Sequence, residues 1–99
     1  MYLVTGSFLF KQENLEQAES VMRNIVEVGR TEPGIVRYTF YPDPDDPLQY
    51  FLFEEWETKE LHDDHFESDF MQATVPGLFE CFAEPPQVYY YDATVAGTL

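Results

Sequence analysis

Residues 49–70, QYFLFEEWETKELHDDHFESDF, contain two periodicities that meet at Thr58. From Gln49 to Glu57 the residues are mostly large, aromatic or branched, which is typical of a β-strand. Thr58 is a favourable helix N-cap, and after it apolar residues return at steps of three and four to about Phe70. The stretch therefore predicts a strand followed directly by a short helix.

The segments on either side complete a β-α-β-β-α-β order within one domain, residues 1–99. We predict further strands at 2–11, 35–41 and 88–92, with a long turn at Pro42–Pro47. A first helix begins at Leu15 and is terminated by Glu32-Pro33-Gly34. Pro76-Gly77 interrupts the second helical region, a last helical piece covers 78–82, and 93–99 form a tail. This order is the ferredoxin-like α+β pattern, in which helices cover one face of a four-stranded antiparallel sheet.

Aromatic residues are more abundant than a thin core requires. Of the 99 residues 44% are hydrophobic and 17% aromatic, with nine Phe and seven Tyr. A domain of this size buries only a moderate share of its surface. We expect the surplus to line a pocket and to cover the open sheet face, where a second copy would pack to form a homodimer.

The charge balance excludes several classes of partner. Five Lys+Arg against nineteen Asp+Glu give a net charge of −14, which repels phosphate backbones and anionic lipid headgroups. The one cysteine, Cys81, cannot form an intramolecular disulfide, and no apolar run reaches the length of a membrane span. The N-terminus lacks the basic region of a signal peptide. We therefore expect a soluble cytoplasmic protein that binds neither nucleic acid nor membranes.

Both histidines lie on the predicted helix after Thr58, at His62 and His65, with the inward apolar residues. Together with Trp56 at the strand end they indicate a site, because histidine exchanges protons near neutral pH. Each histidine could instead be a half-buried structural residue that pairs with a carboxylate. A metal site formed by His62, His65 and Asp69, with Glu54 as a fourth ligand, ranks below a metal-free pocket.

Glu54 shares a face of its strand with Tyr50, Leu52 and Trp56, so it points inward. A buried carboxylate needs a partner, and Arg37 on the neighbouring strand is the expected one. We favour a structural role for this glutamate.

Five short motifs lie in register over nearly the whole chain. They are Glu32-Pro33-Gly34, Asp45-Asp46-Pro47, FEEWE at 53–57, HFESDF at 65–70 and Glu84-Pro85-Pro86. Together they resemble the antibiotic biosynthesis monooxygenase family. The resemblance implies a dimeric α+β barrel with a pocket between the sheet and the helices of each subunit. Members of this family include cofactor-free oxygenases of quinols and anthrones.

The resemblance carries over to individual residues. Trp56 matches the strand-end tryptophan of the anthrone oxygenases, and His65 matches a common family histidine. His62 stands where those enzymes have an active-site tyrosine, and Leu52 where they have an asparagine. Asp69 stands where many members have a second histidine.

The leading hypothesis is a cofactor-independent monooxygenase that acts with O₂ on a small phenolic or quinol substrate, without metal or cofactor. His65 or His62 would remove the substrate's proton, beside Trp56. The substrate pocket would consist of Tyr50, Leu52, Glu54, Phe66 and Phe70. A non-redox isomerase that uses the same histidines, or a small-molecule-binding or structural protein without catalysis, are the alternatives.

Overall fold

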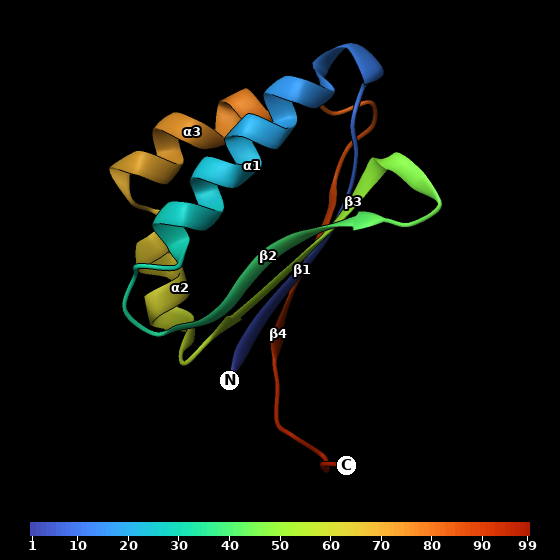
Figure 1. The fold of residues 1–99 in the computed structure, drawn as a ribbon. Helices are drawn as coiled ribbons and strands as arrows, with labels where there is room; N and C mark the ends of the chain where they lie inside the picture. The colour runs from blue at the N-terminus through green and yellow to red at the C-terminus, as the bar shows by residue number, and fades with distance from the viewer.

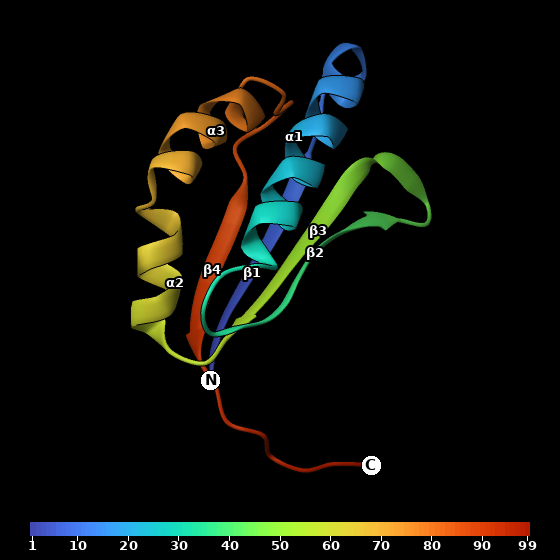
Figure 2. The ribbon, with the colours of Figure 1, turned by 60° about the vertical axis from the view of Figure 1, so that its left-hand side comes forward.

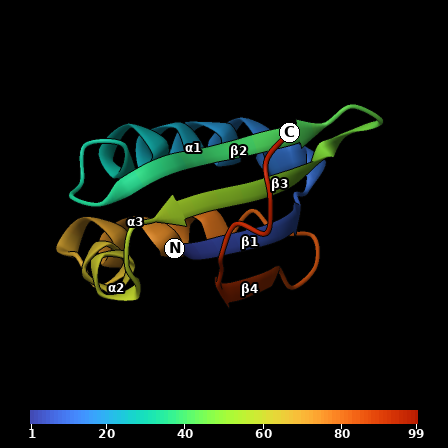
Figure 3. The ribbon, with the colours of Figure 1, turned by 90° about the horizontal axis from the view of Figure 1, so that it is seen from below.

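The computed structural model describes residues 1–99, which form an antiparallel sheet and three helices (Figure 1). The elements are β1 (Tyr2–Leu9), the 3₁₀ turn η1 (Gln12–Asn14), α1 (Leu15–Gly29), β2 (Ile35–Asp43), β3 (Asp46–Trp56), α2 (Lys59–Phe66), α3 (Asp69–Phe79) and β4 (Gln87–Asp92). The strands follow the order β2-β3-β1-β4, which Figure 3 shows side by side. The predicted ferredoxin-like α+β fold is confirmed.

All three helices cover one face of the sheet (Figures 1 and 2). The inner face of β1 is continuous and apolar, because Tyr2, Val4, Phe8 and Phe10 alternate inward and are all buried. Ala18, Met22 and Ile25 on α1 pack against it at helical spacing and are buried too. None of the helices has the length and apolar character that crossing a bilayer would need.

The second helical region is divided at a different place from the one the sequence predicted. α2 ends at Phe66, and Ser68 starts α3 by accepting a hydrogen bond from the backbone N–H of Met71 at 3.2 Å. Pro76 lies inside α3 instead of interrupting it. The carbonyl that Pro76 leaves without a partner belongs to Gln72, which is exposed, so water can satisfy it.

The β2–β3 hairpin is also tighter than predicted. The strands extend to Asp43 and from Asp46, so only Pro44 and Asp45 connect them. β2 is an edge strand of the sheet, where a proline such as Pro42 removes no interior ladder bond. The prediction of a turn over the whole of Pro42–Pro47 was therefore wrong.

The far face of the sheet carries no helix. Tyr41, Phe51, Tyr89 and Tyr91 on this face are 42–57% exposed. Residues 93–99 leave the end of β4 and extend away from the sheet (Figure 1).

Candidate functional site

A cavity of about 340 Å³ lies between the inner sheet face and the three helices. Most of its wall is apolar and comes from all four strands and from each helix. Its polar residues gather together: Glu54 on β3, Tyr38 on β2, His62 and His65 on α2, and Tyr90 on β4. An apolar cavity with a few convergent polar groups is the usual form of a small-molecule site.

His62 lines this cavity, and one of its ring nitrogens has no protein partner. Its side chain is buried, and Nδ1 lies 3.0 Å from Oδ1 of Asp63. No protein group bonds Nε2, yet this atom is not sealed from solvent. Burial lowers the pKa of His62, although the neighbouring Asp63 opposes that effect. The ring is therefore neutral at pH 7, with Nε2 able to accept a proton.

Thr58 sets the position of His62, because its side chain accepts a hydrogen bond from the backbone N–H of Leu61 at 3.2 Å and starts α2. This N-cap was predicted and is confirmed. The ring of His62 lies between those of Tyr2 and Phe66, with centroids 5.2 and 6.3 Å away. Helix start and ring contacts together restrict the direction of Nε2.

His65 is held differently, because both of its ring nitrogens have partners. Nδ1 lies 2.6 Å from Oε1 of Glu32, and Nε2 lies 3.4 Å from the hydroxyl of Tyr38. The ring is 1% exposed and packs against the indole of Trp56 with centroids 4.9 Å apart. His65 is thus a fixed link between β2 and α2, and only His62 of the pair has a nitrogen free for a substrate.

Glu54 is the least expected group in the wall. It is 5% exposed, and the indole Nε1 of Trp56 donates to its Oε1 at 2.8 Å. Burial raises its pKa to about 7, while hydrogen bonds from Trp56 and Tyr38 partly oppose that rise. The prediction that Arg37 would be the partner of Glu54 was wrong. A bulge in β2 pairs Arg37 with Glu55 on the outer face and Tyr38 with Glu54 on the inner face.

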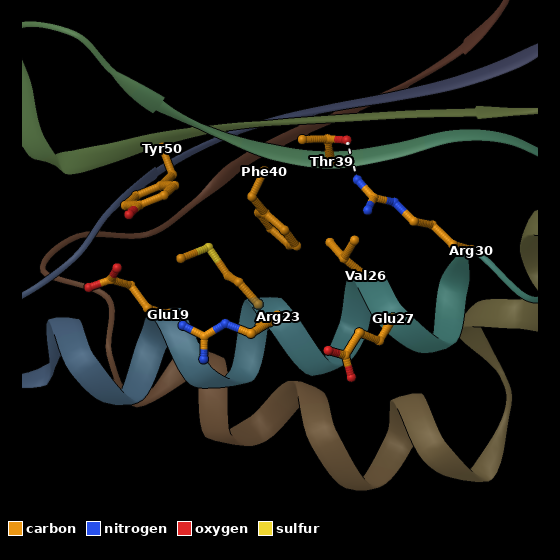
Figure 4. A pocket seen from close by; sticks show the side chains of 9 residues that line it. Glu19, Arg23, Val26, Glu27, Arg30, Thr39, Phe40 and Tyr50 are labelled. Atoms are coloured by element: carbon orange, nitrogen blue, oxygen red, sulfur yellow. Dashed lines mark hydrogen bonds between the residues drawn. The ribbon is translucent and has the colours of Figure 1, made fainter.

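Three of the five predicted substrate residues line the main cavity. Leu52, Glu54 and Phe66 line the cavity. Trp56 is fully buried behind its wall, and Phe70 only packs against the core. Tyr50 instead lines a second hollow between α1 and the β2–β3 edge (Figure 4).

The second hollow has a similar volume, about 340 Å³, but different walls. Its side chains include two glutamates and two arginines and no histidine, and Arg30 reaches across to donate to Oγ1 of Thr39 at 3.1 Å (Figure 4). Its charges are of both signs and balanced, and it has no counterpart of the histidines in the main cavity.

Two site residues were missed, Tyr38 and Tyr90. Tyr38 is buried at 3% exposure, and burial raises its pKa well above the ordinary value. Tyr90 is opposite Val4 in the ladder, which turns it inward, while its neighbours Tyr89 and Tyr91 turn outward. Strand alternation could have indicated Tyr90, whereas Tyr38 depends on the bulge.

The alternative set of metal ligands does not assemble. Asp69 begins α3 and is exposed, so it does not share a helix face with His62 and His65. The predicted spacing assumed one continuous helix, which the break after Phe66 removes.

Fold and site define a ferredoxin-like α+β protein with a partly open cavity that carries histidine and carboxyl groups. The family model of antibiotic biosynthesis monooxygenase matches residues 1–77. The chain belongs to this family, as the five motifs indicated.

The chain is also similar to individual proteins. An uncharacterized protein of Synechocystis sp. is 26% identical over 98% of the chain, which spans 66% of that protein's length. A crystal structure of an antibiotic biosynthesis monooxygenase is 25% identical, with a TM-score of 0.87 over 96% of this chain and 100% of that one. A conserved protein from Methanosarcina mazei Go1 is 22% identical, with a TM-score of 0.89 over 94% of this chain and 92% of that one, and shows likeness of fold.

Proposed function

We propose that this protein is a cofactor-independent monooxygenase for a small phenolic or quinol substrate, with His62 as its general base. One observation carries the proposal. A neutral imidazole lines an apolar cavity, is backed by Asp63 at Nδ1 and has no protein partner at Nε2. Membership of the monooxygenase family and the solved monooxygenase of like fold support the reaction class.

The chemistry can proceed with the electrons of the substrate alone. One phenol and one O₂ give one quinone and one water. The C–H and O–H bonds of the phenol are lost and a second C=O is formed, so atoms and electrons balance without an external reductant. His62 takes the phenol proton, and the electron-rich phenolate passes electrons to O₂ and forms a carbon–oxygen bond. Base catalysis of this kind contributes roughly 10²–10⁴-fold. The apolar wall keeps water from the peroxide that forms.

Other cavity residues orient the ring of the substrate. Phe66 and Leu52 contribute apolar surface on opposite sides, from α2 and β3. Trp56 acts from behind the wall, since it holds Glu54 and packs on His65. His65 is then a positioning residue, and the base, which the sequence left open between His65 and His62, is His62.

Oxygen uptake with a panel of quinols and phenols tests the proposal. We expect His62→Asn to reduce kcat at least about 10²-fold, because the base is lost. Asp64→Asn, on the exposed side of the same helix, is the matched control and should retain wild-type uptake. Wild-type protein that oxygenates no panel member, or a His62→Asn variant as active as wild type, would refute the proposal.

An isomerase is the second candidate, because His62 and Glu54 are two proton-exchanging groups on one cavity. Such an enzyme would move a proton between two carbons of a small carbonyl compound. Turnover under nitrogen, with no oxygen consumed, would favour it over the monooxygenase.

We further propose that the enzyme is a homodimer formed through the open sheet face. The face carries four exposed aromatic residues, Tyr41, Phe51, Tyr89 and Tyr91, and exposed apolar surface of this kind marks protein–protein contacts. Light scattering after size exclusion should give twice the chain mass for wild type. Phe51→Lys should give the monomer mass. A wild-type monomer at micromolar concentration would refute the dimer.

A further inference from the structure

The carboxyl of Glu54 is a buried titratable group of the cavity that takes no part in the removal of the phenol proton by His62. Its Oε1 accepts from the indole of Trp56, and Tyr38, opposite Glu54 in the β2–β3 ladder, is the neighbouring hydroxyl group. No lysine or arginine acts on it, and the charge that does, Glu32, is also negative. A buried carboxyl without a cation favours its neutral, protonated form.

Glu54 is one end of a row of hydrogen-bonding groups that reaches the surface. Tyr38 neighbours both Glu54 and His65, with its hydroxyl 3.4 Å from Nε2 of the histidine. His65 then bonds Glu32 through Nδ1 at 2.6 Å. The Glu32 side chain is 21% exposed, so the far end of the row meets solvent.

The donors in this row can all point one way. An ionised Glu32 only accepts, so Nδ1 of His65 donates to it and Nε2 is left to accept from Tyr38. The single hydroxyl proton of Tyr38 is then used, and its oxygen can accept a hydrogen bond from Glu54 when that carboxyl is protonated. An ionised Glu54 instead competes with His65 for the tyrosine's proton.

We propose that Glu54 is a second catalytic proton carrier of this cavity, connected to the surface through Tyr38, His65 and Glu32. This role rests on the proposed monooxygenase function. After His62 has taken the phenol proton and O₂ has bonded to the ring carbon, Glu54 protonates the peroxide anion. The Glu54 carboxylate then removes the C–H proton as the O–O bond breaks. The leaving hydroxide takes the proton from His62, which yields quinone and water and restores both groups.

The remaining elements around Glu54 do not compete for this role. The titratable groups that face the carboxyl are Tyr2 on β1, Tyr38 on β2, His62 and His65 on α2, and Tyr90 on β4, with Glu32 from the loop before β2. α1 and α3 contribute apolar side chains to the wall. Each of the tyrosines has a raised pKa and stays protonated, and both ring nitrogens of His65 have protein partners, so Glu54 and His62 are the cavity groups left to exchange protons with a substrate.

Infrared difference spectra test the carrier without any substrate. The carbonyl band of a protonated carboxyl group, present in wild type and absent in Glu54→Gln, should disappear with a midpoint near pH 7. After a rapid pH jump the band should respond quickly in wild type and lose its fast phase in Tyr38→Phe. Tyr41→Phe, an exposed tyrosine of the same strand, should respond as wild type. A missing band, or an unchanged fast phase in Tyr38→Phe, overturns the proposal.

Kinetics with an oxygenated substrate separate this role from the proposed function. Glu54→Gln should form the phenolate, visible by its absorption, as wild type does, and consume oxygen about 10²-fold more slowly. Glu55→Gln, on the outer face, should match wild type. If wild type is active and Glu54→Gln consumes oxygen equally fast, the proposed role of Glu54 is overturned but the proposed function is not. Wild type that oxygenates nothing overturns the proposed function, and this role with it.

Discussion

Replacing Glu54 by glutamine should stabilise the fold above neutral pH and leave it nearly unchanged in acid. The carboxyl is buried beside Trp56 and Tyr38 with no cationic partner, so ionisation at alkaline pH places an uncompensated charge in the core. Glutamine has a similar shape and its amide oxygen can accept the same N–H from the indole of Trp56. The neutral side chain never incurs the cost of ionisation.

The size and sign of the effect follow from linkage. The pKa of Glu54 rises from 4.5 in the unfolded chain to about 7 in the fold, a difference of 7 − 4.5 = 2.5. At about 1.4 kcal/mol per pKa unit, ionisation costs about 3 kcal/mol of stability. Because the folded pKa is the higher one, the favourable contribution is complete below pH 4.5 and is lost as pH rises to about 7.

Urea unfolding of wild type and Glu54→Gln, at a series of pH values and one protein concentration, measures this effect. The difference in unfolding free energy between the two proteins cancels the titrating groups that do not interact with Glu54. It should rise by about 3 kcal/mol across the interval and then level off. Glu55→Gln, whose side chain is on the outer face, should give a flat difference curve.

A flat difference curve for Glu54→Gln would refute the reasoning, because it would mean that the carboxyl has the same pKa in both states. His62 cannot produce the expected curve. Its pKa is lowered by burial, so its contribution is present above its unfolded pKa of 6.5 and is lost as pH falls below that value. The corresponding curve for His62→Asn should therefore slope the opposite way.

Two further substitutions, one with a control variant, and one labelling reaction test the local structure. Gly34→Ala should destabilise the fold by roughly 1–3 kcal/mol in urea, because Gly34 has φ 80° and an added Cβ would collide with Leu61. Gly97→Ala in the tail meets nothing and should have no effect. Ser68→Ala should cost about 1 kcal/mol through the lost cap of α3, and circular dichroism should show an earlier thermal transition; an unchanged midpoint would refute the cap. Cys81 is buried with a raised pKa, so iodoacetamide should label it in urea but not in buffer at pH 7.

Alternation along β3 was sufficient to place part of the site in advance. Residues two apart on a strand share a face, so Glu54 and Trp56 were predicted to point inward, and both do. The cap at Thr58 likewise begins α2 where the sequence placed it. The break between α2 and α3 was missed because helical periodicity continues across it, and the signal for it, Ser68 as an N-cap, is a single residue.

The partners of the two histidines could not be predicted, because they depend on long-range geometry. His65 bonds Glu32, 33 residues earlier in the chain. Its contact with Tyr38 requires the bulge in β2, which no local pattern announces. His62 bonds the adjacent Asp63. The two histidines look equivalent in the sequence, but only His62 has a ring nitrogen without a protein partner.

Burial moves both proton carriers toward neutrality, and that shared cause fixes the order of the proposed proton transfers. Before a substrate binds, His62 is neutral at pH 7 because burial lowers its pKa, and Glu54 holds its proton below about pH 7 because burial raises its pKa to that value. A bound phenolate would attract a proton to His62 and repel ionisation of Glu54, since both effects come from one negative charge. The first transfer can then go only to His62, and Glu54 keeps its proton until the peroxide anion appears. A cation beside Glu54 would disturb this order, because it would ionise the carboxyl before the substrate arrived.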